Sequence, residues 1–162
     1  MVDCTSKFEF AETGERVFVQ AIHIPRRFVL DSWGGTETVI LETCRRLPAC
    51  GVDCCVFCPA ALSRPGPDTV SGIPVWRFPY FYPYLGLKAE ARSALDLKGG
   101  NLFSVAMYRQ LMREPQLDLI HLHTAKRLGG IGRTVARKRN IPYVISIHGG
   151  MIDVPAEEVA TW

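Results

Sequence analysis

The sequence predicts an α/β fold built on a doubly wound parallel β-sheet, and two patterns support that prediction. Short apolar runs alternate with segments of helical period along most of the 162 residues. Three of these runs lead into glycine or histidine, at Gly34 and Gly35, at His121 and His123, and at His148. Because ligands bind beyond the carboxyl ends of the strands in such sheets, we expect the three clusters to meet in one ligand site.

The first half of the chain predicts two strands around one helix. Residues 1–15 are polar and irregular and predict a loose leader, and residues 16–22 form the first apolar run. Residues 36–47 carry an apolar stripe of helical spacing that a proline and a glycine end. Residues 52–58 are almost wholly apolar, as expected for a strand covered on both faces. Residues 59–72 are rich in proline, glycine and serine, which predicts a loop.

The middle of the chain is less regular. Residues 73–78 predict a short strand. Residues 79–88 mix aromatic side chains with proline and fit neither the strand period nor the helix period. Residues 101–113 predict a helix, because Asn101 is a favourable N-cap and the apolar residues that follow share one helical face.

The last third returns to the strand and helix alternation. Residues 117–120 predict a strand, residues 128–139 a helix that an asparagine closes, and residues 143–147 a strand that a proline introduces. Residues 151–162 resemble the first turns of a further helix. We therefore expect residues 16–162 to form one domain, because neither repeats nor an internal linker interrupt them.

The composition argues against two classes of protein. Apolar residues make up 48% and charged residues 22% of the chain, as in soluble globular proteins. The net charge of +3 gives no indication of a nucleic-acid partner. No run approaches the ~20 apolar residues of a membrane span and the N-terminus lacks a signal-peptide core, so we expect a cytoplasmic protein.

The six cysteines are interpreted as small buried apolar side chains, and we expect no metal site. Cys54 and Cys58 lie in one expected strand, which separates them by ~13 Å. Two thiolates on one zinc ion lie within ~4.6 Å of each other, so this pair cannot share an ion. Cys54 and Cys55 are neighbours in a strand and should point to opposite faces of the sheet.

Gly34 and Gly35 stand where a strand-exit loop meets the first expected helix. Glycine lets the backbone approach a ligand, and the amides of a helix N-terminus favour anions, so a phosphate or pyrophosphate fits here. The alternative is a tight turn that requires positive φ. Thr36 can cap the helix, and Glu37 is favoured by the helix dipole, although it could also hold a substrate hydroxyl. The pair fits neither GxGxxG nor GxxxxGK[ST], which argues against dehydrogenases and P-loop NTPases.

Two histidine clusters follow later strands. His148 ends the last expected strand and precedes Gly149, which favours a functional role over simple packing. His121 and His123 have the same strand parity and should point to one face. His123 and Thr124 lie nearer the expected crevice, whereas His121 could simply pack. No serine or cysteine stands in a nucleophile-elbow setting, which argues against a triad hydrolase.

Basic and aromatic residues supply further candidates. Lys126 and Arg127 follow the His123 turn and could contact a phosphate. The basic trio at residues 137–139 ends a helix, where cations are favoured by the dipole and solvated. The aromatic run of residues 78–84 could pack on the domain, cradle a lipid-linked acceptor or touch a membrane surface.

Taken in order, these motifs resemble the N-terminal, acceptor-side domain of the family-4 retaining glycosyltransferases with the GT-B fold. The matching stretches are GGTETVILETCRRLPACGVDCCVFCP, DLIHLHT and GIGRTVARKRNIPYVISIHGG. The resemblance covers roughly residues 16–150, and it rests on the order of the motifs more than on any single one. It implies one Rossmann-like half of a two-domain enzyme whose cleft lies between the halves.

The resemblance also implies roles for particular residues. Gly34 and Gly35 would place amides against the donor diphosphate or an acceptor phosphate. His148 would lie near the transferred sugar, and His123 would line the acceptor side. Members of the family generally need no metal or other cofactor, and the nucleotide-sugar is a substrate. Transfer would then rest on positioning and on electrostatic stabilisation of developing charge.

Nothing in the chain resembles the family's C-terminal domain, which binds the nucleotide-sugar donor. The resemblance therefore implies half of an enzyme, truncated before its partner domain or working with one in trans, and inactive alone. Its acceptor would be a polysaccharide, glycolipid or other glycan, which allows a peripheral position at the inner face of the membrane. The alternatives are a non-catalytic docking module or a subunit of a split transferase, and a flavodoxin-type phosphate-binding protein.

Overall fold

The computed structural model describes residues 19–98 and 100–148. The expected leader at residues 1–15, the expected helix from residue 151 and Gly149 lie outside the described residues. The six strands of the sheet are β1 (Val19–Ile24), β2 (Val52–Pro59), β3 (Gly66–Val70), β4 (Ile73–Phe78), β5 (Leu119–Leu122) and β6 (Tyr143–Ile145). The helices are α1 (Gly35–Arg46), α2 (Ala89–Lys98), α3 (Val105–Arg113) and α4 (Lys126–Arg139), with 3₁₀ turns η1 (Leu30–Ser32) and η2 (Leu47–Cys50).

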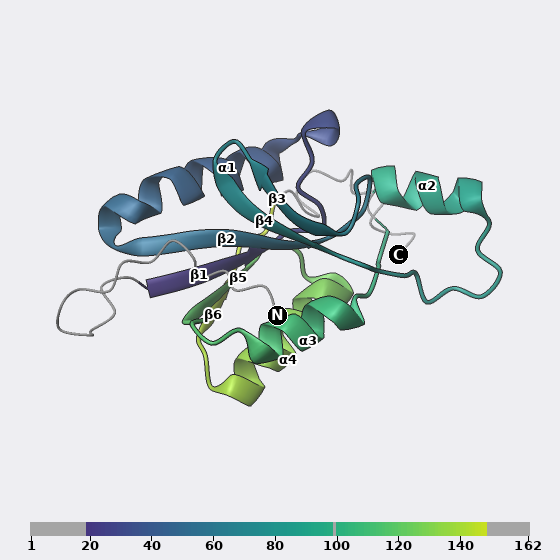
Figure 1. Ribbon diagram of the computed structural model, residues 1–162. Coiled ribbons are helices and arrows are strands. Elements are labelled where there is room, and N and C mark those ends of the chain that lie inside the picture. Colours follow the sequence, from purple (N-terminus) through teal and green to yellow (C-terminus); the bar gives the residue numbers. More distant parts are fainter. Residues whose placement is uncertain (1–18, 99, 149–162) are drawn as a thin grey trace, which may run out of the picture.

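The strand order is β3-β4-β2-β1-β5-β6, and all neighbours are parallel except the β3–β4 pair. In Figure 1, α1 lies over one face of the sheet and α3 and α4 lie over the other. Helices on both faces of a mostly parallel sheet confirm the predicted doubly wound α/β fold. Since β1, β5 and β6 run in the same direction, their carboxyl ends share one edge.

The expected loop at residues 59–72 was wrong in part, because it contains the antiparallel edge strand β3. A two-residue turn joins β3 to β4, and its residues Ser71 and Gly72 have φ values of 51° and 85°. Positive φ at both central residues is the backbone of a tight hairpin turn with the twist that strands require. The Pro67 of β3 is tolerated because β3 is an edge strand.

The start of α3 also differs from the expectation. Ser104 caps this helix, and its hydroxyl accepts a hydrogen bond from the Met107 amide at 3.1 Å. The expected cap, Asn101, instead accepts from the Arg127 amide at 3.0 Å, at the start of α4. This long-range contact between residues 26 positions apart has no local sequence signal. The asparagine that was expected to close α4, Asn140, does so in the left-handed conformation.

The two faces of the sheet bury separate cores. One core packs strand residues such as Ile22 and Ile120 against Met107 of α3 and Val135 of α4. The other core lies under α1 and contains Phe28, Ile40, Cys44, Val56 and Cys58. Cys54 packs against the α1 core and Cys55 belongs to the opposite one, as their alternation predicts.

Two glycines let α4 approach β5 and the turn that follows it. A Cβ atom at Gly132 would lie 2.4 Å from Leu122 Cδ2, and one at Gly129 would lie 2.5 Å from the Thr124 carbonyl oxygen. Such separations are shorter than carbon atoms tolerate, so side chains at these positions would push the helix outward. The glycines therefore hold Thr124 and the N-terminus of α4 beside the carboxyl end of β5.

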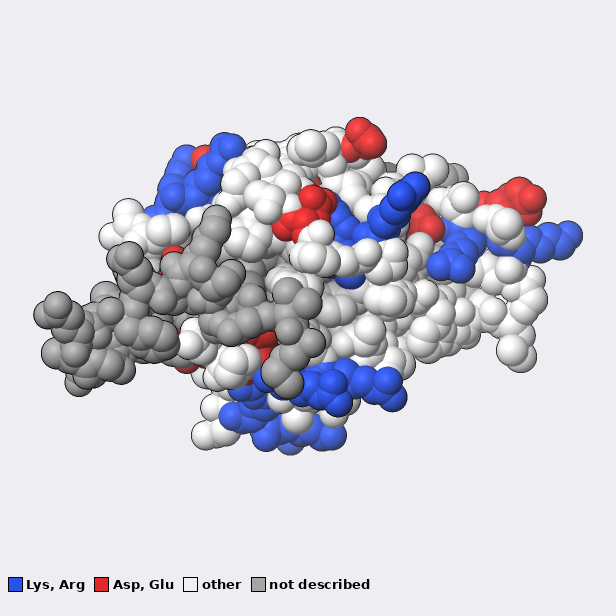
Figure 2. Space-filling view, in the orientation of Figure 1, with Lys and Arg blue, Asp and Glu red and all other residues white. Residues whose placement is uncertain are grey.

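Lysine and arginine side chains gather along the edge of the molecule where α4 lies, as Figures 1 and 2 show together. The last turn of α4 supplies three of them, Arg137, Lys138 and Arg139. Lys138 reaches the Tyr108 hydroxyl at 2.9 Å, and Arg139 donates to the Leu111 carbonyl at 2.7 Å. Among the described residues, the helices are all too short or too polar to cross a membrane.

Candidate functional site

Four histidines form a cluster at the edge of the sheet where β1, β5 and β6 end. His23 lies in β1, His121 lies in β5, and His123 and His148 follow β5 and β6. His23 Nδ1 lies 3.0 Å from His123 Nε2, and His123 Nδ1 lies 2.8 Å from His148 Nε2. The three imidazoles are thus joined end to end in a hydrogen-bonded chain, which we call the histidine relay.

Backbone pairing fixes the relay in place. The His123 amide donates to the Ile24 carbonyl at 3.0 Å, which ties the turn after β5 to the end of β1. His121 is paired in register with His23, and its Nε2 lies 2.8 Å from the Ser146 hydroxyl. The rings of His121 and His123 are 4.1 Å apart, which confirms that they share one face of the sheet. His121 therefore packs beside His23 and His123 and is held by Ser146.

Burial keeps the centre of the relay neutral. Desolvation, followed by the charges of neighbouring histidines, lowers the pKa of His123 to about 2 and that of His121 to about 4. A neutral imidazole has one donor nitrogen and one acceptor nitrogen. His123 must then donate a hydrogen bond to one neighbour and accept one from the other. The protonation of His23 and His148, at the two ends of the relay, decides which neighbour receives the proton.

Cys54 of β2 and Cys44 of α1 lie on the same side of the sheet as the relay. A hydrogen bond between the two thiols, opposed by desolvation, lowers the pKa of Cys54, and His23 lowers it further. The same hydrogen bond and burial raise the pKa of Cys44. Cys54 is thus the thiol of this pair that ionises first.

The Gly34-Gly35 pair lies at the N-terminus of α1, as predicted. Gly34 is the N-cap with φ of −145°, so the alternative of a turn with positive φ does not apply to it. A Cβ atom at Gly35 would meet no described residue within 4 Å, and both glycines are exposed. The backbone at this helix start is therefore open to a ligand. Thr36, the next residue, is half-buried and lies inside the helix rather than at its cap.

Glu37 is almost fully buried and already has two partners. Its Oε2 accepts from the Gly34 amide at 3.1 Å, and its Oε1 lies 3.6 Å from Arg27 Nε. The first contact is half of a capping box and satisfies a helix-end donor. Glu37 thus has a structural role whatever else it contacts.

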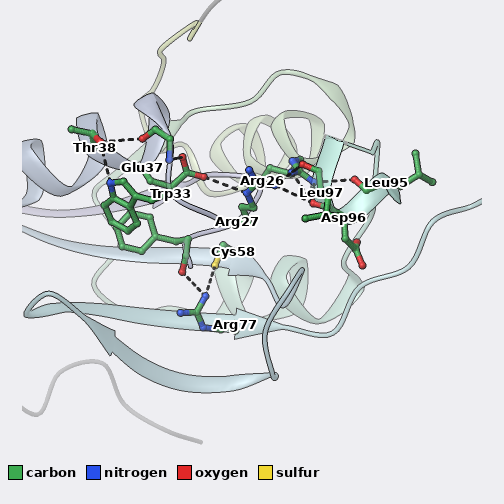
Figure 3. A network of polar contacts seen from close by, with 12 residues as sticks. Arg26, Arg27, Trp33, Glu37, Thr38, Cys58, Arg77, Leu95, Asp96 and Leu97 are labelled. Carbon is green, nitrogen blue, oxygen red and sulfur yellow. Dashed lines mark hydrogen bonds and ion pairs between the residues drawn. The ribbon is translucent and has the colours of Figure 1, made fainter. Parts of the chain in front are cut away.

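Arg26 and Arg27 connect α1 to α2 across the carboxyl edge of the sheet, as Figure 3 shows. Arg26 donates to the Asp96 carbonyl at 2.9 Å through both terminal nitrogens, and Arg27 donates to the Leu97 carbonyl at 2.7 Å. Cations are favoured at a helix C-terminus, where carbonyl groups lack partners within the helix. The side chain of Asp96 in turn accepts from the hydroxyls of Tyr80 and Tyr82.

A small cavity of about 90 Å³ lies between the loop after β1 and the turn after β5. Arg26, Thr124 and Lys126 contribute to its lining, with residues 100–102 and Leu128. Lys126 is exposed at the first position of α4. Two cations next to a hydroxyl and a helix start form a setting that suits an anionic group.

Arg127 has a different environment from its neighbour Lys126. Its guanidinium donates to the Asn101 carbonyl at 2.7 Å and lies 5.7 Å from the centre of the Tyr84 ring. These contacts hold the segment before α3 against α4. A phosphate at Arg127 would have to share the guanidinium with them.

The structure thus brings His123, His148, Thr124 and Lys126 to one edge, and it joins Glu37 to that edge through the Arg26-Arg27 pair. Sequence reasoning did not single out His23, Arg26 and Arg27 as site residues. Their position directly at the carboxyl end of the first strand was the available signal, because that is where such sheets bind ligands.

Comparison with known proteins identifies the family of this chain. Residues 34–162 match the family described as Glycosyl transferase 4-like domain. The alpha-monoglucosyldiacylglycerol synthase of Acholeplasma laidlawii is 42% identical over 54 residues, which are 33% of this chain and 14% of that protein. The putative teichuronic acid biosynthesis glycosyltransferase TuaC of Bacillus subtilis (strain 168) is 28% identical over 135 residues, 73% of this chain and 33% of that protein. The chain therefore spans a third or less of these relatives, and it belongs to the glycosyl transferase 4-like family.

Proposed function

We propose that this domain forms the acceptor side of a retaining glycosyltransferase that moves a hexosyl group from a nucleotide-sugar to a glycan or lipid-linked acceptor. Family membership supports sugar transfer in general. The observation that carries the finer proposal is the histidine relay, which ends at His148 on the edge where β1, β5 and β6 terminate. Ligands of open α/β sheets bind at this edge.

In this proposal His148 lies against the transferred sugar, and His123 positions it through the 2.8 Å contact between their rings. Because the relay fixes the ring of His148, less orientational freedom is lost when the substrate binds. The backbone of Gly149 follows directly and would supply a further polar group to the sugar.

The leaving diphosphate, or a phosphate of the acceptor, would lie between the start of α1 and the start of α4. The amides of Gly35 and Thr36 would face it from one side and Lys126 with Thr124 from the other, while the Gly34 amide stays bonded to Glu37. Helix N-termini and cations stabilise the negative charge that develops as the sugar leaves. Glu37 would hold an acceptor hydroxyl through Oε1 while Arg27 restrains it, and Arg127 would add charge at the rim.

The donor would bind chiefly to a second domain, which this chain would meet in cis or in trans and without which it would turn over little. The matches cover only 14% and 33% of the two relatives, which supports that arrangement. No metal or other cofactor takes part in the proposed transfer step, since amides and basic side chains stabilise the charge.

The acceptor could be reached at the inner face of the membrane. Phe81, Tyr84 and Leu85 lie in the segment between β4 and α2 and are exposed, Leu85 completely. Exposed aromatic and leucine side chains next to a lysine, here Lys88, are suited to the boundary between water and lipid. A relative whose name gives diacylglycerol as part of its product supports a lipid-linked acceptor.

A chimera tests the proposal. The matching third of the Bacillus subtilis relative is replaced by this chain, and sugar transfer from a panel of radiolabelled nucleotide-sugars to membrane lipids and glycans is measured. We expect transfer by the chimera with retained anomeric configuration, and none by the 162-residue chain alone. A folded chimera that transfers no sugar under conditions in which the relative is active would refute the proposal.

A further inference from the structure

Three potential metal ligands from three different elements meet beneath α1. Cys44 comes from α1, Cys54 from β2 and His23 from β1. One imidazole nitrogen of His23 and the two sulfur atoms all lie within 4.8 Å of one another. His23 is fully buried, Cys44 is almost fully buried and Cys54 is half-buried. The proposed sugar transfer gives the two thiols no role.

We propose that Cys44, Cys54 and His23 form a binding site for a thiolate-preferring divalent cation of the zinc type. The ion would bind the two sulfur atoms and His23 Nε2, with a water molecule in the fourth position. On binding, both thiols would lose their protons to solvent, since the thiolate is the form that coordinates.

The spacing suits the ion. In a tetrahedral zinc site the bond lengths place two sulfur atoms about 3.8 Å apart and each sulfur about 3.5 Å from the nitrogen. The observed limit of 4.8 Å leaves room for these values with small side-chain movements. Cys54 and Cys58 cannot share an ion because both belong to β2, whereas Cys44 comes from a different element.

His23 Nε2 gives a second and independent reason. Among the described residues this buried atom has no hydrogen-bond partner of good geometry, and an unpaired buried nitrogen of this kind costs free energy. The other nitrogen of the ring, Nδ1, faces His123 at 3.0 Å. Nε2 is therefore the nitrogen left for an ion, and coordination would remove the cost.

Such an ion would do two things for the domain. It would fasten α1 to β2 and β1, and it would set the direction of the histidine relay. A metal on Nε2 places the proton of His23 on Nδ1, from which it is donated to His123 Nε2. His123 then carries its own proton on Nδ1 and donates it to His148 Nε2. The ion would thereby act on His148 from a distance, without touching the sugar.

The test uses the 162-residue chain, purified under reducing conditions and loaded with zinc or cobalt alone. After dialysis we expect about one metal ion per chain, and the cobalt form should show thiolate-to-metal charge-transfer absorption. The Cys44→Ser and Cys54→Ser variants should lose both signals. Cys50→Ser is the matched control, because Cys50 is an exposed thiol outside the cluster and should leave both signals unchanged.

Thermal melting separates loss of the site from loss of the fold. Zinc should raise the melting temperature of the wild-type chain and of Cys50→Ser, but not that of either cluster variant. Nitrogen NMR of the histidine rings should show His23 protonated on Nδ1 once zinc is bound. Absence of metal in the folded wild type, or equal retention by Cys44→Ser and Cys54→Ser, would overturn the proposal. Its failure would leave the proposed sugar transfer untouched, since that is measured separately in the chimera.

Discussion

The two faces of the sheet differ most clearly along β1 and β5. Toward α3 and α4 these strands point Ile22, Ile24, Ile120 and Leu122, all of them buried. Toward α1 the alternate positions carry His23 and His121, and His123 follows in the same parity. The same two strands therefore build an apolar core on one side and a polar cluster on the other.

This difference shows how a small domain can bury polar side chains on one face of its sheet and still fold stably. Burying imidazoles costs free energy unless they are hydrogen-bonded, and the relay supplies those bonds. The apolar face carries no such cost, and Gly132 allows α4 to pack closely on it. We therefore expect stability to depend mainly on the α3–α4 face and activity mainly on the α1 face.

The largest effect on folding should come from the apolar face. Leu111 is fully buried between α3 and the sheet, so Leu111→Ala removes packing and leaves a cavity. We expect a loss of about 3 kcal/mol in the free energy of unfolding, measured by urea titration of the chain. A loss below that of an exposed control such as Leu85→Ala would show that this face does not dominate stability.

His148→Ala should affect turnover more than folding. In the active chimera we expect about a 100-fold loss of kcat, because one positioned polar group at developing charge is removed. The melting temperature should change little, since His148 is half-buried and bonds only at the end of the relay. Normal turnover per folded molecule, together with a large drop in melting temperature, would assign His148 to the core instead.

Gly35→Val should affect binding alone. A side chain at residue 35 points into open space and fits the helix, so the fold should tolerate it. The branched side chain would cover the amides at the start of α1, and we expect about tenfold or more weaker binding of diphosphate-containing ligands in the chimera. Calorimetric titration gives the affinity. Gly130→Val is a matched control, because Gly130 is an exposed residue of α4 with an equally open Cβ position. Unchanged affinity would mean that the glycine pair only forms the start of α1.

The smallest expected effect is the loss of stability in mild acid, which should come from the buried histidine on the α1 face. The pKa of His123 is about 2 in the fold against an ordinary value of 6.5, so the unfolded chain takes up a proton first as the pH falls. Stability should therefore fall below pH 6.5, by at most about 1.4 kcal/mol per pH unit for this residue. Denaturant titrations between pH 7 and pH 5 measure the slope, which should be shallower in His123→Gln. Equal slopes would mean that His123 is not buried as a neutral group.

Much of the fold followed from local patterns. Strands β1, β2, β4, β5 and β6 overlap the apolar runs that predicted them, because a strand covered by helices is largely apolar. Strands β1 and β5 each end two residues later than expected, at Ile24 and Leu122. The hairpin strand β3 was missed because its proline and glycine resemble a loop, although the Ser71-Gly72 turn was a usable signal. Helix α2 had no such signal, and it depends on Arg26 and Arg27, which bind its last carbonyls from another part of the chain.

The positions of the candidate residues along the strands followed from the sequence, and their roles in binding stay predictions. The sequence placed His123, His148 and the glycine pair after strands, and the parallel sheet brings these strand ends to one edge. It did not predict that Arg127 would bind Asn101, nor that Glu37 would be enclosed by Gly34 and Arg27. Those contacts depend on which loops lie side by side, and residue type alone does not determine that.

By itself the sequence determined which side chains share a face, because alternation along a strand is a local property of the backbone. The tertiary structure alone decided which of them touch. His23 meets His123 across 100 residues because the strand order places β5 beside β1, and Cys44 meets Cys54 because α1 folds back over β2. Such contacts depend on the path of the chain between strands, and the path is set by how the two cores pack.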